Sequence, residues 1–116
     1  ELGRLRLSEV HGCRSCNRGN RLDADSAGLS SVKIAVIGDA EHAVFDAADK
    51  AVIELADLMS LHAHRGRLSQ PLYDALAVHF DDGQILELGL VFSLLAGMAH
   101  FMFAFDMIER EDNCRL

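Results

Sequence analysis

The sequence has little that would break or disorder a chain. It contains one proline and no low-complexity run in 116 residues, half of which are hydrophobic and a quarter charged. This composition is typical of an ordered globular protein. A chain of 12.7 kDa can bury one core but is too short for two. We therefore expect one domain over residues 1–116, and the start at Glu1 without a methionine leaves room for a segment upstream.

Positive charge is also scarce. The chain has 11 Lys and Arg against 18 Asp and Glu, a net charge of −7. Such a balance argues against nucleic acid as the main partner. The charge is uneven, because residues 1–21 carry five arginines and two glutamates, or +3, and the remainder carries −10. The first 21 residues are thus the only electropositive part of the chain.

Cysteines are few and odd in number. Three cysteines in a chain of this length do not make the disulfide framework of a small secreted protein, and no signal peptide is visible. We therefore expect a cytoplasmic protein.

Alternating strand patterns are lacking, whereas helical spacing recurs throughout. Apolar residues repeat every three or four positions in the long segments, and His62, His79 and Phe80 are expected on the inward faces. Residues 30–36 could be a strand, but no partner strand exists, so we favour a helix. The sequence predicts an all-α bundle of about six helices, over residues 1–11, 13–27, 30–36, 46–62, 69–80 and 83–107. Ser69 is the predicted cap of the fifth helix, and Asp81 with Gln84 stands in the capping-box relation at the start of the sixth.

The last helix contains eighteen residues, 88–105, without a formal charge. Its length would suit a membrane span, but acids flank both ends, no basic cluster sets an orientation and His100 lies within it. We therefore expect no membrane span, and a core helix whose remaining face is covered by another subunit. Gly89, Ser93 and Gly97, four residues apart, form a flat strip for close approach. The sequence thus predicts a homo-oligomer through the final helix.

Two of the cysteines form a CxxC motif, Cys13 and Cys16. Residues at i and i+3 of a helix share a face, so the sulfurs can approach closely enough for a disulfide. If Cys13 begins a helix, the unpaired N–H groups and the helix dipole favour thiolate over thiol. Arg14 and Arg18 act in the same direction. These electrostatics favour cysteine redox chemistry.

Two other interpretations of the CxxC motif remain open. It could be half of a zinc site, but no second CxxC exists, and the only other candidate ligands, His62 and His64, form an HxH in a loop, which is usually solvated. The two cysteines could also be inert and buried, since free cysteine packs as a small hydrophobe. We expect no metal and no cofactor, and we interpret Cys114 as an incidental exposed thiol.

The string ELGRLRLSEVHGCRSCNRGN resembles the signature region of the carboxymuconolactone decarboxylase and alkylhydroperoxidase D (AhpD) family. Members of that family carry a Glu, eleven further residues and then CxxC, and Glu1 and Cys13 have this spacing. The resemblance extends over most of the chain, through AGL after the CxxC segment, AADKAVIELADLMS, and DDGQILELGLVFSLLAGMAHFMFAF.

This resemblance implies an oligomeric, all-α, AhpD-like protein with thiol-dependent peroxidase activity. Matched by position, Cys16 would attack the hydroperoxide and Cys13 would resolve the product to a disulfide, which an unknown thiol reductant would reduce. A Glu and a His form the family's proton relay. Glu1 fits the first role, but Asn20 stands where the His is expected, four residues after Cys16.

An amide cannot exchange a proton near neutral pH, so the relay of the family is incomplete here. His11 is the nearest group that could titrate, although a histidine at a helix end that contacts solvent or backbone is the more common case. Glu1 could likewise be an ordinary surface carboxylate. Two alternatives to the peroxidase therefore stay open: a non-catalytic or redox-sensing oligomeric module, and, with less support, a lactone decarboxylase.

Overall fold

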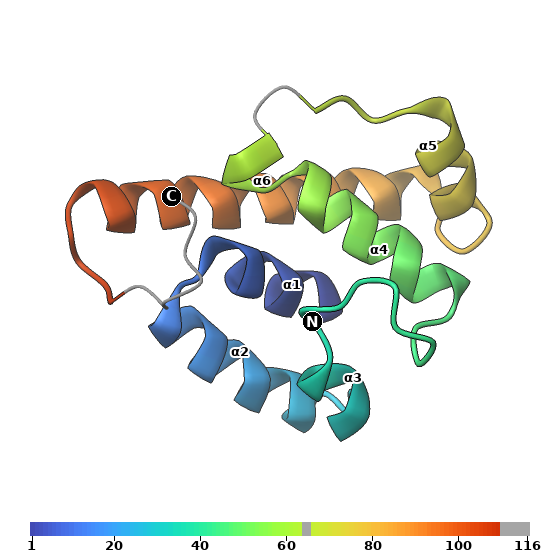
Figure 1. Cartoon of the computed structure of the whole chain (residues 1–116). Helices are drawn as coiled ribbons and strands as arrows, with labels where there is room; N and C mark the ends of the chain where they lie inside the picture. The colour runs from blue at the N-terminus through green and yellow to red at the C-terminus, as the bar shows by residue number, and fades with distance from the viewer. Residues whose placement is uncertain (64–65, 110–116) are drawn as a thin grey trace.

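Six α-helices and one 3-10 turn make up the part of the chain that the structure, a computed structural model, describes, residues 1–63 and 66–109 (Figure 1). Those residues contain no strand. The all-α prediction is confirmed. The elements are α1 (Leu2–His11), α2 (Arg14–Ser26), α3 (Ser31–Ala35), α4 (Ala47–Leu58), the 3-10 turn η1 (Leu61–Ala63), α5 (Gln70–Ala77) and α6 (Asp82–Ala104).

Helix α1 is the centre of the fold. It packs against α2 on one side and against α4 and α6 on the other (Figure 1). Leu5 and Leu7 are almost fully buried, and they belong to two different core clusters. One cluster joins α1 to α4, α5 and α6, and the other joins it to α2, α4 and the segment around Ile37. A helix with buried residues on two sides therefore holds the two halves of the core together.

Helix starts follow the capping residues that the sequence shows. The Ser69 side chain accepts from the N–H of Leu72 at the start of α5. Asp81 and Gln84 form the predicted reciprocal capping box at the start of α6. These predictions are confirmed, because capping depends on residues within one turn of each other.

The ends of three helices differ from the prediction, and one of them is α6, which ends at Ala104 and not at Met107. Helix α4 ends at Leu58, and not at His62, because the N–H and hydroxyl of Ser60 both donate to the carbonyl of Asp57 and close a tight turn. His62 consequently lies in η1 and is exposed. Helix α5 ends at Ala77, so His79 is exposed too, and only Phe80 of this pair is partly buried. The inward placement of the two histidines was wrong.

Helix α6 is the longest helix and is apolar on every side. One face packs in the core, through Ile85, Phe92, Ala96, Ala99 and Phe103. By length and composition the helix could also cross a membrane. Only 22% of its most apolar window is buried within the described part of the chain. The opposite side, which we call the outer face of α6, carries large exposed side chains: Leu86, Leu90, Val91, Leu94, Met98 and Phe101.

Candidate redox site

Cys13 and Cys16 form a disulfide at the start of α2. Cys13 is the N-cap residue, with an extended backbone, and its sulfur accepts from the N–H of Cys16 at 3.2 Å. The two Cα atoms are 5.2 Å apart, within the range that disulfides span. The predictions that Cys13 begins a helix and that the two sulfurs can join are both confirmed.

A tight turn between α1 and α2 places this pair. Gly12 has a left-handed backbone, with φ of 64°, and its N–H donates to the carbonyl of Glu9. The N–H of Cys13 donates to the carbonyl of Ser8. These two bonds are the Schellman arrangement that ends a helix and reverses the chain. Because the reversal occurs directly before Cys13, α2 begins at the disulfide and packs back along α1.

The two sulfur-bearing residues differ in access. Cys13 is 1% exposed and packs against Ala99 and Phe103 of α6. Cys16 is only partly buried, at the edge of the same small cluster. A reagent from solution therefore meets Cys16 before Cys13.

His11 is the titratable group nearest in sequence to the pair, and it is buried, at 2% exposure. Its Nε2 accepts from the N–H of Leu61 at 3.1 Å, so a neutral ring carries its proton on Nδ1. Burial, and secondarily the positive charge of His62, lowers the pKa of His11 to about 4. The ring is therefore neutral near pH 7 and joins the end of α1 to η1. Contact with backbone, one of the two expectations for this residue, describes it best.

Arg4 links the two positions that the family resemblance assigns to the proton relay. Its guanidinium donates to both carboxylate oxygens of Glu1 at 3.0 Å and to Oδ1 of Asn20 at 3.0 Å. The Asn20 amide donates in return to the carbonyl of Arg4 at 3.2 Å. Glu1 and Asn20 are thus brought together, but through a guanidinium that stays protonated and cannot pass a proton on.

Glu1 itself lies away from the sulfurs. It precedes the first residue of α1, whereas Cys13 follows the last, and a ten-residue helix is about 15 Å long. Sequence reasoning missed Arg4, although an Arg three residues after Glu1 is at the spacing of a helical ion pair.

Arg14, between the two cysteines, is paired with a residue far along the chain. Its guanidinium meets the carboxylate of Glu109 at 2.9 Å, and its backbone N–H donates to the Glu109 carbonyl at 3.2 Å. Ile108 packs against the cluster that holds Cys13. We call residues 107–109 the strap. The Glu109 carboxylate of the strap therefore offsets part of the positive charge of Arg14, which the sequence analysis assigned entirely to stabilising the thiolates.

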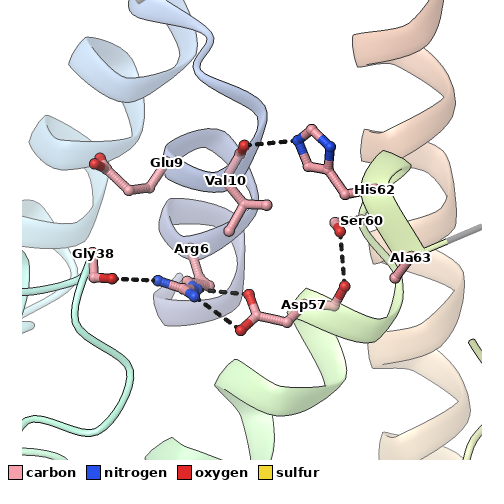
Figure 2. A pocket seen from close by; sticks show the side chains of 8 residues that line it. All are labelled: Arg6, Glu9, Val10, Gly38, Asp57, Ser60, His62 and Ala63. Atoms are coloured by element: carbon pink, nitrogen blue, oxygen red, sulfur yellow. Dashed lines mark hydrogen bonds and ion pairs between the residues drawn. The ribbon is translucent and has the colours of Figure 1, made fainter. Parts of the chain in front are cut away.

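A polar cavity of about 560 Å³ is lined in part by His62 (Figure 2). Arg6 crosses it, with two bonds to the Asp57 carboxylate at 2.6 and 2.9 Å and one to the Gly38 carbonyl at 3.0 Å. His62 points at the carbonyl of Val10, with Nε2 at 3.1 Å. Most of these polar groups bind one another, so the cavity offers few free donors to a ligand. The described residues that line it are Arg6, Glu9, Val10, Gly38, Asp57, Ser60, His62 and Ala63.

The described residues test whether the CxxC motif is half of a zinc site. Within residues 1–63 and 66–109, no group of three or more His, Cys, Asp or Glu side chains could hold a metal ion. His64 and Cys114 lie outside the described residues. The two cysteines are joined to each other and not arranged around a common centre.

Comparison with known proteins adds no relative: the chain matches no family model, no curated protein and no solved structure. The resemblance to the AhpD family therefore depends on the motif residues themselves.

Proposed function

We propose that the protein is a thiol-dependent oxidoreductase that reduces hydroperoxides through Cys16 and Cys13. The observation that carries the proposal is the Cys13–Cys16 disulfide at the N-terminus of α2, with one sulfur accessible and the other buried. Unequal access suits two different roles, one thiol that meets the substrate and one that waits behind it. The resemblance to the AhpD family assigns the same roles to the same two residues.

The reaction begins with the Cys16 thiolate. Its sulfur attacks the terminal oxygen of the hydroperoxide, the O–O bond breaks, and the alkoxide leaves and takes up a proton, which leaves Cys16 as a sulfenic acid. Cys13 then attacks the Cys16 sulfur. The S–S bond forms, the S–O bond breaks, and water leaves. An external dithiol completes the cycle by reducing the disulfide and becoming oxidised itself.

The start of α2 supports thiolate formation at this place. Cys13 is the N-cap, so the free N–H groups and positive end of the dipole face the thiols. The N–H of Cys16 already donates to the Cys13 sulfur and would stabilise negative charge there. Thiolate is the form that both steps need.

The test is thiol titration before and after one equivalent of a hydroperoxide, with peroxide consumption measured in parallel. Wild type should lose two thiols, and Cys16→Ser should lose peroxide consumption. Cys13→Ser should stop at a sulfenic acid that a dimedone reagent traps. Cys114→Ser is the control and should behave as wild type. Unchanged consumption in Cys16→Ser would sink the proposal.

One observation favours a second function, redox sensing without efficient turnover. Asn20 occupies the relay position and is held by Arg4, which cannot donate a proton to the leaving alkoxide. A pair that oxidises but turns over slowly would serve as a sensor. Asn20→His should raise the peroxidase rate by about 10-fold or more if the missing relay limits it. No increase would favour the sensor.

We also propose that the outer face of α6 packs against a second copy of the chain. Soluble monomers rarely expose apolar patches of this extent. Acidic residues at both ends of the helix disfavour a membrane surface. A Cβ added at Gly89 or Gly97 would meet no described atom within 4 Å, so a second helix could approach closely there.

The oligomer is tested by mass in solution and by one substitution. Wild type should exceed 12.7 kDa at micromolar concentration, and Leu94→Glu, at the middle of the outer face, should reduce the protein to a monomer with unchanged helical content. A wild-type monomer that partitions into phosphatidylcholine vesicles would show a membrane role instead. A wild-type monomer that ignores vesicles would also contradict the proposal.

A further inference from the structure

The chain reverses sharply after α6 and returns to the disulfide. Asp106 has a left-handed backbone, with φ of 52°, and its N–H donates to the carbonyl of Phe103. The N–H of Met107 donates to the carbonyl of Met102. This is the same Schellman arrangement that Gly12 makes at the end of α1. In Figure 1 the described segment after α6 turns back towards the start of α2.

The reversal places the strap, residues 107–109, at the start of α2. Ile108 packs against the cluster of Cys13, Ala99 and Phe103, to which the partly buried Cys16 also belongs. Glu109 binds Arg14 twice, through its backbone carbonyl and through its carboxylate. The strap thus combines an apolar contact beside the disulfide with a polar anchor between the two cysteines.

The polar anchor also acts on charge. An arginine next to a thiol favours the thiolate, and the carboxylate of Glu109 at 2.9 Å offsets that effect of Arg14. The bound strap therefore adds to the packing around Cys13 and weakens the stabilisation of a leaving thiolate by Arg14. Release of the strap would reverse both effects.

The contacts of the strap are of the kind that open easily. The Arg14 and Glu109 side chains are 52% and 76% exposed, and exposed ion pairs contribute little to stability. The turn itself carries Asp106 where a glycine is usual, and a non-glycine residue in the left-handed region is less favourable. The side-chain ion pair and the turn therefore contribute little to holding the strap in place.

From these contacts we infer that the strap is an autoinhibitory element, which slows thiol–disulfide exchange at Cys13–Cys16 while it is bound and speeds it when it is released. The inference rests on the proposed cycling of this pair between disulfide and dithiol. In the exchange, a reductant thiolate bonds to the sulfur of the more accessible Cys16, the S–S bond breaks, and Cys13 leaves as a thiolate. The second thiol of the reductant then releases Cys16 and closes the oxidised reductant.

The test measures the rate at which dithiothreitol reduces the disulfide, in the full chain carrying Cys114→Ser. Free thiols are trapped with iodoacetamide and counted by mass spectrometry. Glu109→Gln should speed reduction about threefold, since it removes the carboxylate charge that offsets Arg14. Ile108→Ala should speed it by a similar factor through access alone. The two together should give about 10-fold, if the two contacts act independently.

Matched controls separate the strap from general effects. Glu54→Gln removes an exposed acid of α4, and Val78→Ala shortens an exposed apolar side chain, both away from the strap. Both controls should reduce at the wild-type rate. Acceleration by Glu109→Gln without any by Ile108→Ala would overturn the strap as a cover, and rates within 1.5-fold of the controls for both would overturn the proposal.

The same variants distinguish this inference from the proposed function. If no variant consumes hydroperoxide but the reduction rates still differ as expected, the peroxidase proposal fails and the strap stands. If peroxide is consumed normally but reduction rates are equal, the strap fails and the peroxidase stands.

Discussion

The inner and outer faces of α6 are equally apolar, yet they have opposite surroundings. Phe92 on the inner face is 2% exposed, whereas Leu94, two residues later, is 68% exposed. The difference arises because α1 and the helices around it cover only one side of α6. Composition and hydrophobic periodicity cannot distinguish the two faces, since the helix has no polar side to point away from the core.

The largest effect is expected for a side chain shortened on the inner face of α6, and the same change on the outer face should have almost none. Phe92→Ala should lower the free energy of unfolding by about 3–5 kcal/mol, because it leaves a cavity in the main core. Leu94→Ala should change it by less than about 0.5 kcal/mol in the monomer. Urea denaturation at low protein concentration measures both. A large loss for Leu94→Ala would mean that the outer face is already covered.

His11 should make the folded protein less stable in acid. The pKa of His11 is lowered from 6.5 to about 4 in the folded protein, so the unfolded chain takes up the proton first. Stability from this group is complete above pH 6.5 and is lost as the pH falls towards 4, by about 3 kcal/mol in total.

Urea denaturation between pH 7 and 4 checks this expectation. His11→Gln keeps an acceptor for the Leu61 N–H and should flatten the pH dependence. Equal slopes in wild type and His11→Gln would contradict the assignment.

Gly3 of α1 lies against the inner face of α6 and should tolerate no side chain. A Cβ at Gly3 would overlap the Phe92 ring, so Gly3→Ala should destabilise the protein by about 1–3 kcal/mol through overpacking. Thermal unfolding followed by circular dichroism measures the loss. Combining Gly3→Ala with Phe92→Leu should recover part of it, and a loss unchanged by the second substitution would contradict this contact as the cause.

The smallest effect is expected at a glycine on the outer face. A Cβ at Gly97 would meet no described atom within 4 Å, so Gly97→Ala should stabilise the monomer by about 0.5–1 kcal/mol through helix propensity. The same substitution should weaken self-association if the flat strip is the contact. Thermal unfolding and sedimentation together check the two signs, and stabilisation with unchanged association would remove the strip from the interface.

The parts of the fold that the sequence predicted correctly are local. The caps at Ser69 and Asp81 and the start of a helix at Cys13 each depend on residues within one turn. The end of α4 was predicted wrongly, because the hydrophobic spacing continued past Leu58 while Ser60 closed a turn.

The surroundings of the candidate site were not predictable in the same way. His11 receives its hydrogen bond from Leu61, fifty residues away, and Arg14 pairs with Glu109, 95 residues away. Arg4 joins Glu1 to Asn20 across two helices. No spacing rule connects such residues, because their meeting depends on how the helices pack.

The sequence by itself determined that this chain forms helices, where most of them begin, and that Cys13 and Cys16 share the start of one. Those features follow from backbone hydrogen bonding and side-chain spacing over a few residues. Tertiary structure alone decided which face of α6 is buried, that His11 is neutral, and that residues 107–109 lie against the disulfide. These depend on desolvation and on contacts between distant segments, which exist only once the helices have packed around α1.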